Sequence, residues 1–172
     1  MNYATIKTHD VANGTGVRVS LFVSGCTHKC KGCFNAEAWD FNYGSPYTPD
    51  TEKYLTNALS HRYIRGLSLL GGEPFEIQNQ PVLLDLLEKV KMLYPEKSVW
   101  CYSGYSFESD ILSGNLGENA LHMLNFIDIL VDGEFIEEKK DLSLRFRGSS
   151  NQRIIDVQSS LRFGKTVLCT EF

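Results

Sequence analysis

Hydrophobic and polar positions along the chain follow two different periods. Residues 17–23 (VRVSLFV) alternate and are rich in β-branched and aromatic side chains, which predicts a strand that ends at the Ser-Gly pair 24–25. Residues 81–94 repeat apolar side chains every three or four positions, which predicts an amphipathic helix. Further apolar segments predict strands at 67–72, 97–102 and 126–131, and a weaker helical pattern covers residues 118–124.

Another helix is expected to begin near Thr48, whose hydroxyl can cap the first turn, with Pro49 suited to the first helical position. Strands that alternate with helices predict βαβ units and a parallel sheet, so the fold class is α/β. The chain changes character near Gly133. The polar and charged segment from Phe135 to Arg153 is expected to form a long loop, and such loops in compact domains are usually functional.

The composition is typical of one globular domain, which we expect to span residues 1–172. Basic and acidic residues number 17 and 21, giving a net charge of −4; a dedicated nucleic-acid-binding protein would instead need a basic excess for phosphate contacts. No apolar segment approaches the ~20 residues of a membrane span, and the first ten residues contain no apolar signal-peptide core. We therefore expect a soluble, cytoplasmic protein.

Three of the five cysteines, Cys26, Cys30 and Cys33, are closely spaced in the pattern C-x₃-C-x₂-C. The odd number and the clustering argue against a disulfide framework. Three thiolates in one short loop can hold three corners of an Fe–S cube, which leaves the fourth iron open to a small molecule. The lack of a fourth cysteine nearby disfavours a ferredoxin-like electron carrier.

A zinc site is the main alternative that the cysteines leave open. His28 could act as the fourth ligand of a Cys₃His site, which would make the protein a zinc-stabilised binding module. Its position between two of the cysteines makes a tetrahedral chelate cramped. Cys101 and Cys169 lie far away in the sequence and are expected to be small packing residues.

Glycine and polar residues follow the predicted strands at their carboxyl ends. They are the cysteine cluster after Val23, Gly71-Gly72-Glu73 after Leu70, Ser103-Gly104 after Tyr102, and Asp132-Gly133 after Val131. Because the carboxyl ends of parallel strands meet at one edge, we expect one ligand site there. Gly71 and Gly72 would let a ligand approach the backbone, and Glu73 could accept a hydrogen bond from a cationic amine. Taken alone, a tight turn closed by Pro74 explains the same residues.

The cysteine motif followed by Gly-Gly-Glu-Pro resembles the radical S-adenosylmethionine superfamily. The segment from Asn13 to Arg18 (NGTGVR) resembles its branch that activates glycyl-radical enzymes. Val131-Asp-Gly133 and the segment from Arg147 to Asp156 (RGSSNQRIID) narrow this to the activators of anaerobic ribonucleoside-triphosphate reductase. An activator of another glycyl-radical enzyme, such as pyruvate formate-lyase, is the nearest alternative, and the late segment argues against it.

The resemblance implies a set of cofactor contacts. Cys26, Cys30 and Cys33 would hold a [4Fe-4S] cluster, whose open iron would be chelated by S-adenosylmethionine. The remaining contacts to S-adenosylmethionine would come from Gly32, Cys33 and Phe34, from Gly71, Gly72 and Glu73 around its methionyl amine, and from Ser103. Many members place an aromatic residue just before the third cysteine to pack on the adenine. Here that residue is Gly32, so Phe34 or another ring would have to replace it.

The resemblance also implies the reaction, the partners and the form of the sheet. Reductive cleavage of S-adenosylmethionine would give a 5′-deoxyadenosyl radical, which would abstract hydrogen from a glycine of the anaerobic ribonucleoside-triphosphate reductase. The electron would come from a low-potential donor such as flavodoxin. The fold would be a partial, open (β/α) barrel of about four to five βα units, open enough to admit a protein loop. Arg145, Arg147 and Arg153 would form a docking surface.

Overall fold

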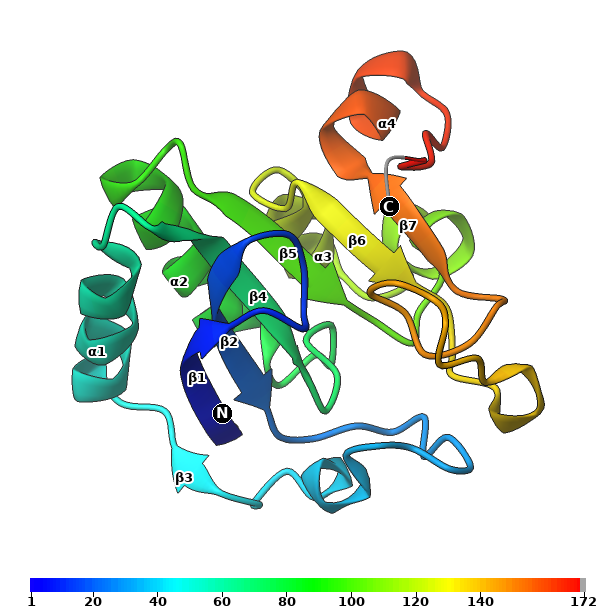
Figure 1. Ribbon diagram of the computed structural model, residues 1–172, viewed down its shortest axis with the longest axis horizontal. Coiled ribbons are helices and arrows are strands. Elements are labelled where there is room, and N and C mark those ends of the chain that lie inside the picture. The colour runs from blue at the N-terminus through cyan, green and yellow to red at the C-terminus, as the bar shows by residue number, and fades with distance from the viewer. Residues whose placement is uncertain (171–172) are drawn as a thin grey trace.

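A computed structural model describes residues 1–170 as a seven-stranded sheet with helices on one face (Figure 1). The strands are β1 (Asn2–Asp10), β2 (Val17–Val23), β3 (Ser45–Pro46), β4 (Ile64–Gly71), β5 (Ser98–Tyr102), β6 (Ile129–Asp132) and β7 (Arg153–Asp156). Their order across the sheet is β3-β1-β2-β4-β5-β6-β7. The four central strands, β2, β4, β5 and β6, are parallel, which confirms the predicted α/β class.

The α-helices are α1 (Pro49–Leu59), α2 (Gln80–Leu93), α3 (Glu118–Leu124) and α4 (Val157–Phe163). Shorter turns form the 3₁₀ helices η1 (Ala36–Trp39) and η3 (Glu137–Lys139) and the π-helix η2 (Phe107–Leu112). Thr48 caps α1 as expected: its hydroxyl accepts from the Thr51 N–H, and the Thr51 hydroxyl accepts from the Thr48 N–H. Within residues 1–170, no helix combines the length and the apolar composition needed to cross a bilayer.

Three strands and one helix lie outside the sequence-based expectations. β1 was not predicted because its inner face offers the core only half-buried side chains such as Tyr3 and Ile6. β3 and β7 are too short to show a period, and α4 follows β7 directly. Both β1 and β7 are antiparallel to their inner neighbours, so they close the flanks of a parallel centre. The predicted strand at 126–131 begins later, at Ile129, because residues 125–126 still form the turn that ends α3.

The central strands divide their side chains between two faces. Leu21, Leu69 and Cys101 point toward the helices and belong to the main apolar core, where all three are fully buried. Their neighbours Phe22 and Leu70 point to the opposite face. One face therefore holds the core, and the other is available for a site.

Arg18 joins three of the parallel strands from within the sheet. Its guanidinium donates to the Ser68 hydroxyl (2.7 Å), the Leu67 carbonyl (2.7 Å) and the Ser98 carbonyl (2.8 Å), and it lies over the Trp100 ring. The side chain is 0% exposed, and burial lowers its pKa to about 10. The last residue of the NGTGVR segment is therefore a structural clamp between β2, β4 and β5.

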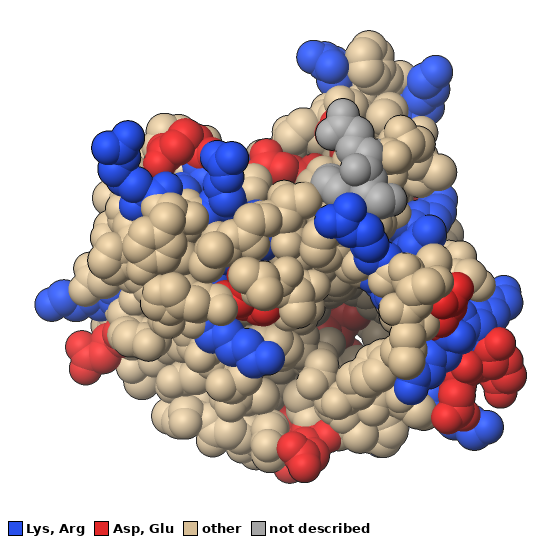
Figure 2. Space-filling model, in the orientation of Figure 1, with Lys and Arg blue, Asp and Glu red and all other residues tan. Residues whose placement is uncertain are grey.

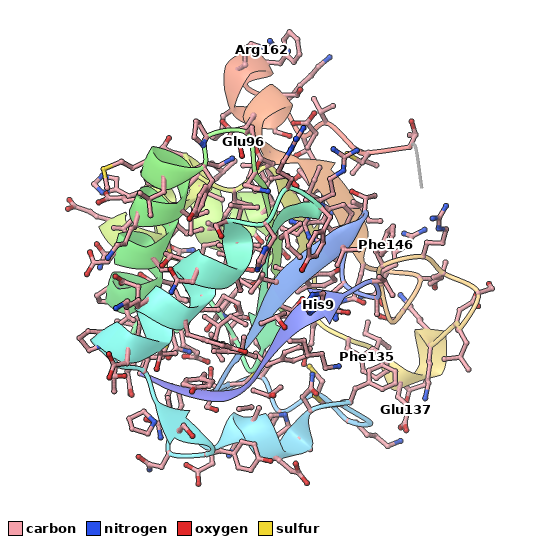
Figure 3. All side chains as sticks on the ribbon, turned by 60° about the vertical axis from the view of Figure 1, so that its left-hand side comes forward. His9, Glu96, Phe135, Glu137, Phe146 and Arg162 are labelled. Atoms are coloured by element: carbon pink, nitrogen blue, oxygen red, sulfur yellow. The ribbon has the colours of Figure 1, made fainter. Side chains whose placement is uncertain are left out.

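The loop between β6 and β7, residues 133–152, is called the late loop below. It extends from the β6–β7 end of the sheet, on the side of the molecule away from α1 (Figure 1), with Phe135, Glu137 and Phe146 marking its course (Figure 3). The Gln152 side chain braces it, accepting from the Gly148 N–H at 2.8 Å and donating to the Gly133 carbonyl at 2.9 Å. The predicted long loop is confirmed, except that its last residue, Arg153, begins β7.

Candidate functional site

A cavity of about 500 Å³ lies on the sheet face opposite the helices. Its walls are Phe22, Leu70 and Tyr102 from the strands, together with the segment after β2 and the late loop. Figure 2 shows the opening as a hollow right of centre, with Lys and Arg side chains gathered along its right-hand side. The late loop therefore covers a face that would otherwise be bare.

The cysteine loop, residues 24–35, begins where β2 ends, and all three clustered thiols line the cavity. Main-chain hydrogen bonds tie its start to η1: the Gly25 N–H donates to the Ala38 carbonyl (2.8 Å), and the Cys26 N–H donates to the Trp39 carbonyl (3.2 Å). Cys26 is buried, and the other two cysteines are half-buried. The short spacing and these ties bring the three thiols to one wall.

Burial raises the pKa of two of these thiols. The pKa of Cys26 rises to about 12 through desolvation, reinforced by the Glu73 carboxylate. The pKa of Cys30 rises to about 11 through desolvation and through Glu134 of the late loop. Without a metal these two sulfurs therefore keep their protons at neutral pH, and a metal that binds them must displace those protons.

Gly71 and Gly72 both line the cavity, but neighbouring backbone already occupies the space above them. A Cβ on Gly72 would lie 2.5 Å from the Gly25 carbonyl oxygen and 2.9 Å from that of Ala38. Gly71 has φ +111°, and its Cβ would lie 2.7 Å from the Val23 nitrogen and oxygen. These contacts show a requirement that the sequence did not reveal: the glycines let β4 and the cysteine loop pack closely.

Glu73 is 1% exposed, and its carboxylate joins two strand ends. One oxygen accepts from the Ser103 hydroxyl (2.9 Å) and the Phe75 N–H (2.9 Å), and the other accepts from the Gly104 N–H (2.7 Å). The His28 Nε2 lies 3.4 Å from the second oxygen, and the carboxylate raises the pKa of His28. Glu73 and Ser103 thus meet each other in the cavity wall, as the strand-end argument predicts.

The remaining expected contacts divide between two places. Phe34 lines the cavity, is 61% exposed and packs its ring against Phe135 of the late loop, with a centroid distance of 5.3 Å. Gly32 is not among the residues of 1–170 that line the cavity; it has φ +71°, and its Cβ would meet the Glu137 carboxylate at 2.7 Å. An exposed ring therefore stands two residues beyond the position where the superfamily pattern expects one.

The residues at the end of β6 do not line the main cavity. Asp132 and Gly133 line a separate, smaller cavity of about 350 Å³. Arg153 also lines it and binds the carboxylates of both Asp132 and Glu108 (2.6 Å to the latter), so its guanidinium is already engaged. Arg147, by contrast, lines the main cavity and donates to the Gln152 carbonyl at 2.7 Å. The three arginines expected to form one docking surface therefore include two with different structural roles.

Sequence reasoning missed the residues that hold the cysteine loop from the side of β4. The Asn79 amide donates to the Ser24 carbonyl at 3.0 Å, and the Glu76 carboxylate accepts from the main chain and the hydroxyl of Thr27. No motif marks these residues, since their partners lie about fifty positions away along the chain. The one feature of the sequence that could have drawn attention to Glu76 and Asn79 is their position shortly after the Gly-Gly-Glu-Pro motif.

The donor set suits an Fe–S cluster. Thiolates are the usual ligands of such clusters, and three of them face one cavity with space beside them. In the part of the chain that is described, residues 1–170, no three His, Cys, Asp or Glu side chains are already gathered around a single metal ion position. A cube presents its irons at separate corners, so its ligands need not converge on one point.

Comparison with known proteins decides the family. The family model described as a 4Fe-4S single cluster domain matches residues 12–155. The activating protein of anaerobic ribonucleoside-triphosphate reductase from Enterobacteria phage T4 is 42% identical over 154 residues, which is 90% of this chain and 93% of that protein. The chain belongs to this family of reductase-activating proteins.

Other members of this activating-protein family show the same breadth of similarity. The protein so named from Escherichia coli K12 is 40% identical over 88% of this chain and 96% of its own length. That from Vibrio cholerae is 42% identical over 90% of this chain and 97% of its own length. Both alignments therefore extend well beyond the cysteine loop.

Proposed function

We propose that this protein is a radical S-adenosylmethionine enzyme that activates an anaerobic ribonucleoside-triphosphate reductase by forming its glycyl radical. The observation that carries the proposal is that three clustered cysteines, Glu73 and Ser103 line one cavity. The names of the relatives supply the partner, and the 4Fe-4S family match supports the cluster. In this proposal the open seven-stranded sheet serves as the partial barrel of the superfamily.

The protein residues have three tasks in this proposal. Cys26, Cys30 and Cys33 hold a [4Fe-4S] cluster, which supplies the electron that cleaves S-adenosylmethionine to methionine and a 5′-deoxyadenosyl radical. Glu73 and Ser103, with Gly71 and Gly72, form the wall against which the methionyl end of S-adenosylmethionine lies. Holding the reacting atoms at close range supplies most of the remaining catalysis, since the chemistry belongs to the cofactors.

The late loop faces the protein substrate in this proposal. Leu142 is 85% exposed and lines the cavity together with the exposed Phe34, so apolar side chains border the entrance. A glycine-bearing loop of the reductase would enter between them. The protein works in the cytoplasm in this proposal and takes its electron from a low-potential donor such as flavodoxin.

The test is anaerobic incubation of the reconstituted protein with the candidate reductase, S-adenosylmethionine and a reductant. The expected result is a glycyl radical signal in electron paramagnetic resonance on the reductase, together with formation of 5′-deoxyadenosine. Iron and zinc content are measured on the same sample, because the zinc-module alternative requires zinc and no iron. A colourless protein that binds zinc and yields no radical would overturn the proposal.

A further inference from the structure

The carboxylate of Glu76 is buried against the cysteine loop. Glu76 is 8% exposed, and one of its oxygens accepts from both the main-chain N–H and the hydroxyl of Thr27, each at 2.6 Å. Thr27 directly follows Cys26 in the chain. An acidic side chain from the segment after β4 thus contacts the residue adjacent to an expected cluster ligand.

This contact removes a donor from the surroundings of the thiols. Main-chain N–H groups that donate to cluster or ligand sulfur stabilise the reduced cluster and raise its reduction potential. The Asn35 N–H makes such a bond to the Cys33 sulfur at 3.4 Å. The Thr27 N–H instead donates to the Glu76 oxygen, so the main-chain hydrogen bonds to the Cys26 sulfur come from His28 and Lys29 and not from Thr27.

The charge acts in the same direction. Reduction adds an electron to the cluster, and a carboxylate in a buried setting opposes that added negative charge, because Coulomb interactions are strong where water is excluded. Glu73, the other buried carboxylate of this segment, is shared among Ser103, Phe75 and Gly104 and lies beside His28. The Glu76 carboxylate accepts hydrogen bonds from the neutral donors of Thr27, and its charge also contributes to the raised pKa of His28.

We infer that Glu76 is a positioning residue that fixes the Cys26 end of the cysteine loop and lowers the reduction potential of the cluster held there. The inference rests on the proposed function, because it requires the cluster. A low potential suits the cleavage of a sulfonium bond, which needs a strong reductant. Glu76 therefore adds to the driving force of that step, alongside the Glu73 carboxylate, while the cysteines attach the cluster.

The decisive variant is Glu76→Gln, which keeps an acceptor oxygen for both Thr27 donors and removes the charge. Its iron content after anaerobic reconstitution should match that of the unmodified protein. Its cluster midpoint potential, measured by redox titration followed with electron paramagnetic resonance, should shift to more positive values. Glu88→Gln, at an exposed carboxylate on α2, is the matched control for net charge and should leave the midpoint unchanged.

Two further variants separate charge from attachment. Thr27→Val keeps the carboxylate and the main-chain bond, so its midpoint should stay at the original value. Glu76→Ala removes charge and acceptor together, so its midpoint should shift positive and its iron should be lost faster to a chelator. If the Glu76→Gln midpoint equals that of the unmodified protein, or if Glu76→Ala retains iron equally long, the inference is wrong.

Failure of the Glu76 inference and failure of the proposed function give different experimental results. A protein that binds the cluster and shows the Glu76 shift but forms no glycyl radical would refute the activation proposal alone. A protein that reconstitutes no Fe–S cluster at all would overturn both.

Discussion

A Cβ placed on Gly72 would lie 2.5 Å from the carbonyl oxygen of Gly25. Two main-chain bonds join the Gly-Gly-Glu segment to the end of β2 and to the cysteine loop: the Gly72 N–H donates to the Val23 carbonyl (2.7 Å), and the Glu73 N–H donates to the Gly25 carbonyl (2.8 Å). The Gly-Gly-Glu segment and the cysteine loop therefore form one unit, and a change in either is transmitted to the other.

Gly72→Val should consequently impair cluster assembly as well as cofactor binding. The added side chain meets backbone oxygens, which cannot rotate away, so the cysteine loop must shift. The measurements are iron content after anaerobic reconstitution and S-adenosylmethionine affinity. Gly117→Asn is the control, because that glycine has positive φ and open space around it. Full iron content in Gly72→Val with lost affinity would instead show that the valine obstructs the ligand alone.

Three cysteines, and not five, should carry the iron. Cys26→Ala, Cys30→Ala and Cys33→Ala should each abolish S-adenosylmethionine cleavage and leave the iron low or unstable, because the cube loses a corner. Cys101→Ala should keep the iron and cost on the order of 1 kcal/mol of folding stability, since its side chain lies in the core away from the cavity. Cys169→Ala should also keep the iron.

His28→Ala provides the matching test of the zinc alternative. If the site binds zinc, His28 is one of the metal ligands, and removing its side chain should release the zinc. In the Fe–S interpretation iron should remain, because His28 serves as a contact of Glu73. Iron and zinc content settle which occurs, and loss of iron in this variant would count against the three-cysteine assignment.

Arg18→Met should destabilise the whole sheet. The substitution leaves the Ser68 hydroxyl and the carbonyls of Leu67 and Ser98 without their buried donor. We expect the free energy of unfolding to fall by about 3 kcal/mol or more, measured by denaturant titration. Arg62→Met, at an exposed position, should stay within about 0.5 kcal/mol. If Arg18→Met lowers the free energy of unfolding no more than Arg62→Met does, Arg18 does not stabilise the contact between β2, β4 and β5.

The ion pair between Glu108 and Arg153 should make stability depend on pH. The hydrogen bond from Arg153 lowers the pKa of Glu108 from 4.5 to about 2. A depressed pKa stabilises the fold above pH 4.5, and this contribution is lost as the pH falls through about 2. Because the pair is partly exposed, Glu108→Gln should cost at most about 1 kcal/mol at pH 7. The difference between the two proteins should vanish near pH 2, and an equal difference at both pH values would contradict it.

Arg147→Ala should weaken both uncoupled S-adenosylmethionine cleavage and activation of the reductase. The side chain lines the main cavity and donates a hydrogen bond within the late loop, so its loss should disturb both the cavity wall and the entrance. Rates of 5′-deoxyadenosine formation with and without the reductase provide the comparison. If only the rate with the reductase falls, Arg147 is a docking residue, as the sequence alone suggested.

The sequence was most informative where local chemistry determines structure. The β2 strand, α3 and the Thr48 cap follow from side-chain period and capping preference, and the convergence of Cys26, Glu73 and Ser103 follows from strand polarity. The antiparallel flanks could not be predicted, because a strand such as β7 is defined by its partner and has too few residues to show a pattern.

The site shows the same division. The cysteine spacing predicts the cluster ligands. The hydrogen bonds from Thr27 to Glu76 and the close packing above Gly72, by contrast, depend on distant segments that meet only in the folded chain. A glycine in the sequence does not reveal whether a ligand or neighbouring backbone fills the space beside it. Arg147 and Arg153 are close together in the sequence but line different cavities. Arg147 lies in the late loop at the main cavity, whereas Arg153 begins β7 and lines the smaller cavity.

The walls of the cavity come from segments that lie far apart in the sequence, and this has a consequence for biosynthesis. The cysteines are translated before the late loop, which covers the same cavity. Until that loop has been made, the thiols face an unfinished, solvent-open surface. The enclosed form of the cavity can therefore arise only after the late loop has been made, and a chain that stops before residue 133 would leave the thiols on an open surface.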